Sequence, residues 1–330
     1  MDETTKQTSQ HDWDVIVVGG GPAGLAAALM LGRARRRTLA IDAGQPRNRF
    51  AAHMHGVLGH EGLEPAELLR RGREEVAEYG VEVRDARVRD VAELTDGLRI
   101  VLADGAELST RALIVATGLT DQLPEIPGLA SRWGASVLHC PYCHGWEVRD
   151  RPLGVLATSP LNLHQAQLVR QWSEDLTLFS AAIEPLDADV EARLRSRGVR
   201  IVREPVVEVL GEGAAVSGVR LADGSVVELD ALFTGGTLLP HDDFVASLSL
   251  DRSENPMGSY LTVDPVGQTS HPRIWAVGNV VNPGANVPLA IGAGTMTGSV
   301  VNMALVSEEF DAAAAPDQPS AVPVHLGERE

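Results

Sequence analysis

The sequence predicts an α/β fold made of two related units, and two observations support this. A short apolar, β-branched run at 14–18 leads directly into a glycine-rich turn and then into an alanine- and leucine-rich helical stretch. Such an order is typical of a buried parallel strand followed by a helix. The order strand, Ala-Asp-Gly turn, strand and glycine-ended strand occurs at 98–118 and again at 218–236. This repeat has the scale of a domain, so two Rossmann-like units are expected, the second beginning near residue 153.

The composition is that of a globular protein. The chain has 330 residues, enough for two domains, with 44% hydrophobic and 22% charged residues. Its formal net charge of −17 opposes binding to nucleic acid or to an anionic membrane. Residues 1–6 lack the charged-then-apolar pattern of a secretory signal, so we expect a cytoplasmic location.

Residues 14–42 carry a complete dinucleotide fingerprint. Gly19 allows the tight turn, Gly21 lets the backbone approach a pyrophosphate, and Gly24 lets helix and strand pack closely. The helix that follows offers unpaired N–H groups and a positive dipole end to the phosphates. Asp42 ends the second strand, where its carboxylate can accept a hydrogen bond from a ribose hydroxyl.

An irregular segment at 44–62 comes next, followed by a predicted amphipathic helix over 64–79 and a strand over 81–84. The irregular segment contains three histidines in a short span, His53, His55 and His60. They could indicate a metal, but we interpret them as residues of a solvated loop or of a loop packed beside a cofactor.

The only two cysteines, Cys140 and Cys143, form a C-x-x-C unit that can close a small disulfide. With His139 and His144 they could bind zinc, but a structural zinc site usually draws its ligands from two separated segments. The C-x-x-C-H pattern also fits haem attachment, which would require export. An inert buried pair is a further alternative. We favour a redox-active dithiol because the chain also carries a dinucleotide fingerprint.

The second unit lacks a nucleotide fingerprint. Its first strand is followed by 157–162, which contains no glycine, and its next strand by 180–184, which contains no lysine or arginine. A 2′-phosphorylated nicotinamide dinucleotide would need glycines after the first of these strands and a basic residue after the next. The second unit is therefore not expected to bind NADPH in the usual way.

A strand and turn at 273–279 precede an apolar helix that is expected to begin near Pro288. The stretch 283–305 is nearly long enough to span a bilayer, but it contains polar side chains and lacks flanking lysine or arginine. We predict a buried helix whose small residues allow close packing, namely Gly292, Gly294 and Gly298.

Over about residues 12–306 the chain resembles the low-molecular-weight thioredoxin reductases, a branch of the two-dinucleotide flavoproteins. The likeness is carried by the fingerprint with Asp42, the crossover at 115–118, the C-x-x-C in the second unit, and 277–279 before the final helix. It implies a homodimer that binds FAD. The FAD domain is then discontinuous, at 13–118 and 239–308, around an inserted unit at 119–238, with flexible tails at 1–12 and 309–330. The residues assigned to FAD are Gly19, Gly21, Pro22, Ala23, Gly24, Asp42, Arg49, Thr117, Gly118, Gly278, Asn279, Leu289 and Ala290.

The chain departs from thioredoxin reductases in ways that point to a different electron flow. His144 stands where those enzymes have an acidic residue, Asn279 stands where they have Asp, and the NADPH fingerprint is missing. These departures and the block 140–147 resemble FAD-dependent dithiol oxidases that close disulfides in gliotoxin- and holomycin-type natural products. The resemblance implies a small-molecule dithiol as substrate and O₂ as the oxidant, which is reduced to H₂O₂.

We expect Cys140 to be the outer sulfur that meets the substrate and Cys143 the inner one. His144 is the first candidate for the base that ionises a thiol, and His139 is the second. Tyr142, Trp146 and the 53–60 loop are candidates for substrate contacts. A disulfide reductase that uses NADPH or another electron donor is one alternative function, and a flavin-bound redox sensor or binding protein without turnover is another.

Overall fold

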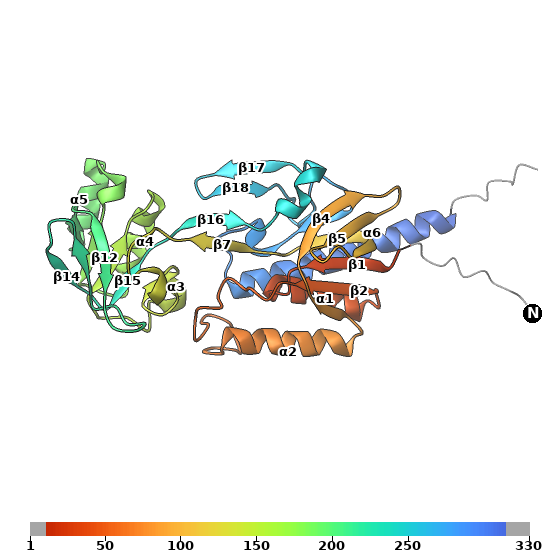
Figure 1. Ribbon diagram of the computed structural model, residues 1–330, viewed down its shortest axis with the longest axis horizontal. Helices are drawn as coiled ribbons and strands as arrows, with labels where there is room; N and C mark the ends of the chain where they lie inside the picture. Colours follow the sequence, from red (N-terminus) through yellow and green to blue (C-terminus); the bar gives the residue numbers. More distant parts are fainter. Residues whose placement is uncertain (1–10, 315–330) are drawn as a thin grey trace, which may run out of the picture.

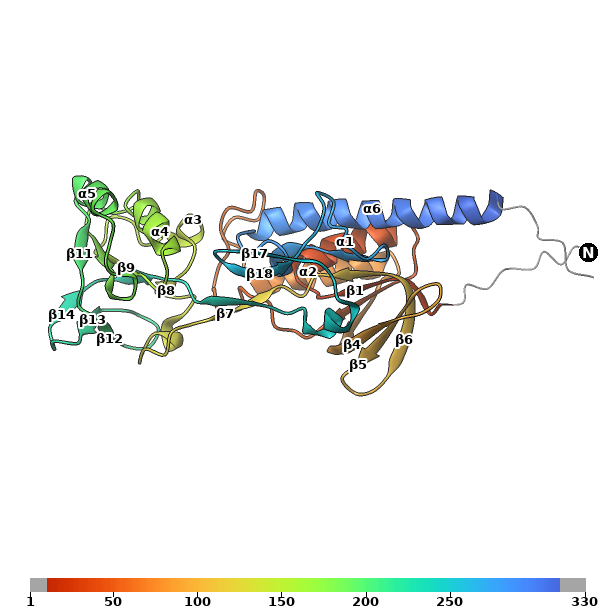
Figure 2. The same cartoon turned by 90° about the horizontal axis from the view of Figure 1, so that it is seen from above.

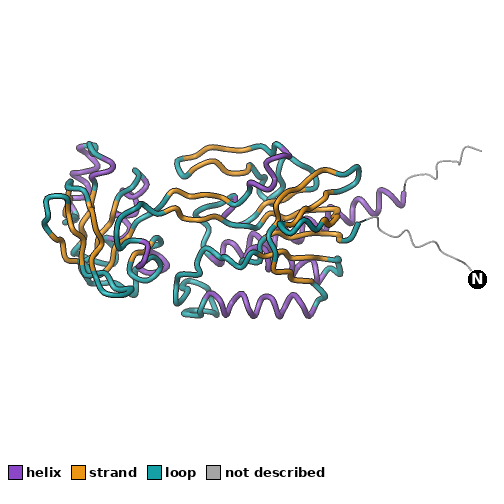
Figure 3. Tube along the Cα trace, in the orientation of Figure 1, coloured by secondary structure: helices purple, strands orange, loops and turns teal. Residues whose placement is uncertain are grey.

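The computed structural model describes residues 11–314, and the predicted tail residues 1–10 and 315–330 lie outside the described residues. The described chain forms two lobes joined by a pair of extended segments (Figures 1 and 3). Each lobe is built on its own mainly parallel sheet. The predicted two-unit α/β fold is therefore confirmed.

The first lobe contains a seven-stranded sheet with the order β3-β2-β1-β6-β5-β4, in which β19 also pairs with β6. The strands are β1 (Trp13–Val18), β2 (Thr38–Asp42), β3 (Glu82–Asp85), β4 (Val88–Glu93), β5 (Leu98–Leu102), β6 (Glu107–Val115) and β19 (Ile274–Ala276). All pairs are parallel except β4–β5 and β5–β6. Because β19 comes from the far end of the chain, this lobe is discontinuous in sequence, as predicted.

Helices cover one face of this sheet. They are α1 (Pro22–Arg33), α2 (Pro65–Glu78) and α6 (Val287–Ala314). Apolar side chains of α1 and α6 form one core with the β1 residues Val15 and Val17. The other face is covered by the 3₁₀ segment Asp243–Leu248, whose Phe244 and Val245 join a second core. The hairpin β17 (Arg252–Asn255) and β18 (Gly258–Leu261) follows that segment.

The second lobe contains a parallel sheet of order β11-β10-β9-β15-β8 and a small antiparallel sheet of order β12-β13-β14. The strands are β8 (Val137–Leu138), β9 (Leu153–Leu156), β10 (Leu176–Phe179), β11 (Arg200–Val202), β12 (Val206–Leu210), β13 (Gly218–Leu221), β14 (Val226–Glu228) and β15 (Ala231–Phe233). The helices are α3 (Pro141–His144), α4 (Leu161–Val169) and α5 (Ala188–Ser196). This unit thus repeats the strand-and-helix order of the first without its glycine-rich turn.

The two lobes are connected by β7 (Leu119–Gln122) and β16 (Thr237–Pro240), which pair antiparallel. Figure 1 shows both strands crossing from one lobe to the other. The predicted domain boundaries, at 118/119 and 238/239, lie at the start of β7 and within β16. The chain therefore enters and leaves the second lobe through a single two-stranded ladder.

The predicted tails are too long at both ends. Asp12 is fixed to Ser109, because its carboxylate accepts hydrogen bonds from the Ser109 N–H and hydroxyl. At the other end, α6 continues through residues 309–314 to Ala314. Glu309 pairs there with Arg36 and Arg111. These long-range ion pairs hold both segments in place, and nothing in the local sequence signals them.

Helix α6 is buried along one side only. It lies along α1 (Figure 2), and a Cβ atom on Gly294 or Gly298 would overlap the Ala23 or Ala27 carbonyl of that helix. Gly292 faces open space, so the prediction that it packs closely is wrong. Within residues 11–314, α6 is the one helix that is long and apolar enough to cross a membrane. A third of its apolar stretch is buried in the fold.

Two alanine substitutions test this packing. Gly294→Ala is expected to lower the free energy of unfolding by about 1–3 kcal/mol, because a methyl group must be forced into a closed contact. Gly292→Ala, in the same helix, is expected to raise it by about 0.5–1 kcal/mol, because glycine is a poor helix former. Thermal or urea unfolding measures both. Equal effects of the two substitutions would contradict the assignment of the buried side.

Candidate active site

A cavity of about 1390 Å³ lies between the two lobes and receives side chains from both. It exceeds the 300–1,000 Å³ or so that is typical of a single small-molecule site, so it has room for more than one ligand. The structure brings together most of the residues predicted from the sequence. Those that line the cavity are Gly19, Gly21, Pro22, Ala23, Asp42, Thr117, Gly118, His139, Cys140, Cys143, His144, Gly278, Asn279 and Ala290.

The glycine-rich turn has the geometry that a dinucleotide pyrophosphate requires. Gly19 has a φ of 113°, and a Cβ atom there would overlap the Ala116 carbonyl. A Cβ on Gly21 would meet nothing within 4 Å, so this position opens onto the cavity. Gly24 lies outside the cavity and packs against the Gly19 carbonyl. Helix α1 begins next to this turn without a side-chain cap, which leaves its first N–H groups available to phosphate.

Asp42 reaches the cavity, and a second residue that the sequence did not suggest holds it there. Arg73 of α2 donates hydrogen bonds to the carboxylates of Asp42 and Asp85. The Asp42 carboxyl also occupies the space in which a Cβ of Gly20 would stand. Arg73 is 31 residues from Asp42 in the sequence, so only the fold brings the pair together.

Arg49 does not line the cavity, contrary to expectation. Its guanidinium lies 4.2 Å from the centre of the Phe50 ring, and Nη1 donates to the Pro46 carbonyl at 3.0 Å. Arg47 lines the cavity instead. Its Nε and Nη2 each donate to the Asp121 carboxylate at 2.7 Å. This bidentate pair, which links the loop after β2 to β7, fixes Arg47 at the wall and turns the neighbouring Arg49 outward.

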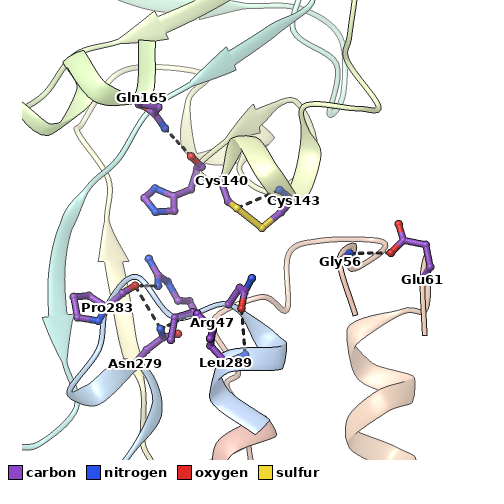
Figure 4. The surroundings of a disulfide bond; sticks show 12 residues. Arg47, Gly56, Glu61, Cys140, Cys143, Gln165, Asn279, Pro283 and Leu289 are labelled. Carbon is purple, nitrogen blue, oxygen red and sulfur yellow. Dashed lines mark hydrogen bonds between the residues drawn. A yellow bond between two sulfur atoms is a disulfide. The ribbon is translucent and has the colours of Figure 1, made fainter. Parts of the chain in front are cut away.

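The first turn of α6 is capped by a side chain of the loop that precedes it. The Leu289 N–H donates to Asn286 Oδ1 at 3.2 Å, and the Leu289 side chain is 59% exposed and outside the cavity lining (Figure 4). The predicted contact of Leu289 with FAD is therefore not supported by its side chain. Asn279 Nδ2 donates to the Asn282 and Ala285 carbonyls at 3.0 and 2.9 Å. An aspartate cannot donate these bonds, which explains why the amide suits this loop.

The cysteines form a disulfide at the start of the short helix α3. The Cys143 N–H donates to Cys140 Sγ at 3.2 Å. Such a bond stabilises negative charge on sulfur, so it favours a thiolate at Cys140 after reduction. Figure 4 shows the disulfide facing two segments, the loop after β2 that carries Arg47 and the stretch from Asn279 to the start of α6.

Both candidate histidines lie in the same cavity wall. Burial lowers the pKa of His144, and the nearby Glu147 carboxylate opposes that effect. Desolvation also lowers the pKa of His139, and the Arg47 charge adds to it. His139 is held by its backbone, since its carbonyl accepts from Gln165 Nε2 at 2.6 Å. Burial thus favours the neutral form of each imidazole, which is the form that can accept a proton.

The 53–60 loop of the first lobe contacts the segment 140–147 of the second lobe, which carries the cysteine pair. His55 Nδ1 lies 2.7 Å from Glu61 Oε1, and its Nε2 lies 3.6 Å from Glu147 Oε1. The Gly56 N–H donates to the other Glu61 oxygen (Figure 4). His53 and His55 line the cavity, whereas His60 does not.

Tyr142 and Trp146 lie outside the cavity lining, contrary to the interpretation from sequence. The Tyr142 ring packs edge-on against Trp172, and Arg149 stacks on the Trp146 ring. Both rings are largely exposed, at 71% and 63%. The two rings thus lie at the surface around α3, each with one aromatic or cationic neighbour.

In the turn after β9, where a nucleotide would bind, a side chain accepts the hydrogen bonds of the backbone N–H groups. The Asn162 Oδ1 atom accepts from the Thr158 N–H at 2.9 Å, the Ser159 N–H at 3.0 Å and the Thr158 hydroxyl at 3.2 Å. These donors would otherwise be free for a phosphate. Asn162 thus replaces the glycines with an internal cap, which agrees with the missing fingerprint.

The neighbouring position after β10 is acidic. Ser180 donates to Glu184, and Glu184 pairs with Arg203 at 3.4 Å. Arg203 also pairs with Glu191 at 2.5 Å. The sequence did not suggest Arg203, but two carboxylates neutralise it. Because Arg203 is already paired with carboxylates, it is not free to bind a 2′-phosphate.

Comparison with known proteins shows likeness over nearly the whole chain. A family model described as pyridine nucleotide-disulphide oxidoreductase matches residues 13–296. The chain is 31% identical over 309 residues to "Thioredoxin reductase tcpT" of Claviceps purpurea, covering 89% of this chain and 95% of that protein. HlmI, a solved structure, gives a TM-score of 0.87 at 43% identity over 91% of this chain and 95% of that one. An oxidoreductase from Agrobacterium tumefaciens gives 0.85 at 40% identity over 89% of this chain and 99% of that one.

Proposed function

The chain belongs to the pyridine nucleotide-disulphide oxidoreductase family, and we propose that it is an FAD-dependent dithiol oxidase that closes a disulfide in a small molecule. The observation that carries this proposal is the pairing of a redox-active cysteine pair with a second unit unsuited to NADPH. Cys140 and Cys143 lie in the cavity, while Asn162 and Glu184 occupy the positions that would hold the nucleotide's phosphates. Electrons therefore come from the dithiol.

The cysteine pair exchanges with the substrate in two steps. A substrate thiolate bonds to Cys140 Sγ, and Cys143 leaves as a thiolate. The second substrate thiolate then bonds to the first substrate sulfur, and Cys140 leaves as a thiolate. The Cys143 N–H that points at Cys140 Sγ stabilises this leaving group. The substrate loses two electrons and two protons, and the cysteine pair gains the electrons.

His144 accepts the proton of the attacking substrate thiol. A free thiol titrates near 8.5 and is mostly un-ionised at pH 7, so the step needs a neutral base beside the disulfide. His144 directly follows Cys143 and lines the cavity, and burial lowers its pKa. Burial thereby favours the neutral imidazole, which is the form that can accept the thiol proton.

The residues present fit FAD. The turn at 19–24 would hold the pyrophosphate, Asp42 a ribose, and the wall that contains Gly278, Asn279 and Ala290 the flavin end. Once bound, FAD would take the two electrons from the reduced pair and pass them to O₂, which with two protons gives H₂O₂.

Gly21→Val tests the cofactor site. The side chain would project into open cavity space, so the fold should tolerate it while the pyrophosphate loses its approach. We expect the purified variant to lose most of its bound FAD, seen by absorbance, with an unfolding midpoint close to that of FAD-stripped wild type. Gly292→Val, at an exposed position of α6 outside the cavity lining where a Cβ atom also meets nothing within 4 Å, controls for loss of a glycine. Normal FAD content in Gly21→Val would contradict the assignment.

We also propose that the chain forms a homodimer through the outer side of α6. The side chains there recur at intervals of seven residues and are 53–73% exposed, namely Leu289, Met296, Met303 and Phe310. Such spacing puts them on one side of the helix, and the net charge of −17 disfavours an anionic membrane as their partner.

The double substitution Met296→Glu and Met303→Glu is expected to shift the protein from dimer to monomer in sedimentation velocity, because it places two charges in an apolar contact. Leu58→Glu, at another fully exposed leucine, serves as the control. A wild-type monomer at micromolar concentration would refute the proposed dimer.

A thioredoxin-reductase-type activity is the second candidate, favoured by the name of the Claviceps relative. Anaerobic reduction separates the two candidates. We expect dithiothreitol to bleach the flavin absorbance of the purified protein and NADPH to leave it unchanged. Bleaching by NADPH alone, at a rate that supports turnover, would replace the oxidase proposal with the reductase.

A further inference from the structure

The cavity extends into the second lobe along α4, beside the turn at which Asn162 takes up the N–H groups that a nucleotide phosphate would need, and we call this part of the cavity the crevice. Helix α4 forms its wall, and besides Asn162 and Gln165 three of its residues line the cavity, namely Leu161, His164 and Leu168. Their spacing of three and four residues puts them on one face of the helix. Leu161 is 46% exposed, so the wall presents apolar surface to the cavity.

The crevice lies directly beside the outer cysteine. Gln165, on the same face of α4, donates to the carbonyl of His139, the residue before Cys140 (Figure 4). Asn162 Nδ2 donates to Gln165 Oε1 at 2.8 Å, and both side chains are buried. This chain of hydrogen bonds fixes the wall relative to the disulfide, so a molecule against α4 is next to Cys140.

Apart from the start of α1, which would take the FAD pyrophosphate, the charges of the cavity do not suit an anion. Among the described residues that line it, Arg47 is the only arginine or lysine, and Asp121 and the Pro283 carbonyl occupy its guanidinium. Two further carboxylates line the cavity, those of Asp42 and Glu125. A carboxylate or phosphate on the ligand would therefore lose water without gaining a free cation.

We propose that this crevice binds the carbon skeleton of an uncharged, apolar dithiol and so directs its sulfurs to Cys140. The inference rests on the proposed oxidase function and adds the substrate class: neutral small molecules with an apolar body. The nucleotide position of the second unit then serves as a substrate subsite, with Leu161 and Leu168 as its apolar contacts.

Dihydrolipoamide and dihydrolipoate test the charge preference, because they differ only in a neutral amide against a carboxylate. At pH 7.5 we expect wild-type kcat/KM to be at least about tenfold higher for dihydrolipoamide, mostly through KM. Calorimetry with the oxidised products provides a readout without turnover, in which lipoamide should bind more tightly than lipoate. Equal constants for the two probes would overturn the charge argument.

Leu161→Arg tests the position of the subsite. We expect about a tenfold loss in kcat/KM for dihydrolipoamide, the effect of losing the contact of one partly buried apolar side chain. The preference over dihydrolipoate should also shrink or reverse, whereas oxidation of dithiothreitol, which has no carbon body beyond its dithiol to contact α4, should be unchanged. Val226→Arg, at an exposed strand position of the same lobe outside the cavity, is the matched control.

The two proposals fail in different ways. If no dithiol reduces the flavin, the oxidase function itself is wrong. If dithiothreitol and both lipoyl probes are oxidised, but Leu161→Arg changes all three by the same factor or none of them, the subsite is wrong and the function stands. Binding of NADP⁺ to wild type with a micromolar Kd would also overturn the subsite, because the crevice would then still accept a nucleotide.

Discussion

Cys140→Ser and Cys143→Ser should each lower dithiol oxidation by at least about 10³-fold, since neither variant can form the disulfide that accepts electrons. The two variants should nevertheless differ in thiol chemistry. Both cysteines line the cavity, but the Cys140 sulfur accepts the Cys143 N–H, so the Cys140 thiolate is favoured.

The neutral reagent 4,4′-dithiodipyridine measures this difference by release of thiopyridone. The remaining Cys140 in Cys143→Ser should react at least about tenfold faster at pH 7 than the remaining Cys143 in Cys140→Ser. Mass spectrometry of Cys143→Ser treated with oxidised lipoamide should show a mixed disulfide on Cys140. The reverse order of reactivity would make Cys143 the sulfur that meets the substrate.

His144→Ala should slow flavin reduction by a dithiol about 10²-fold at pH 7, the usual contribution of a positioned base. Because burial lowers the pKa of His144, the imidazole stays neutral at pH values below its ordinary pKa of about 6.5. The wild-type rate should therefore fall only as the pH drops below that value.

The pH profile of the variant identifies the role of His144. Without the base, the rate of flavin reduction in His144→Ala should rise with pH, because the substrate thiol ionises unaided only near pH 8.5. The difference in rate between the variant and the wild type should therefore shrink at high pH. His60→Ala, in a loop histidine outside the cavity lining, should leave the profile unchanged. A deficit that is constant from pH 6 to pH 9 would mean that His144 has a structural role.

Local patterns were enough to predict the parts of the fold that depend on neighbouring residues. The strand, turn and helix at 13–33 form as expected, because glycines with special backbone geometry and a β-branched strand are visible in the sequence itself. The return of the chain to the first sheet at β19 was predicted from the family resemblance.

Contacts between distant segments were not predictable in this way. Arg73 reaches Asp42, and Arg47 replaces Arg49 at the cavity wall because Asp121 binds it from the connecting strand. The cap that Asn162 places on the second unit's turn likewise depends on side-chain geometry. The sequence showed only that glycines were missing there, whereas the structure shows what occupies their position.

Oxygen stoichiometry tests the central claim most directly, which is that dithiol electrons reach O₂ without a nicotinamide. The purified protein would be supplied with dihydrolipoamide in air-saturated buffer without NADPH, and O₂, H₂O₂ and lipoamide would be followed together. We expect one O₂ consumed and one H₂O₂ formed for each disulfide closed, and Cys140→Ser should give none. Absence of O₂ consumption until NADPH is added would contradict the account.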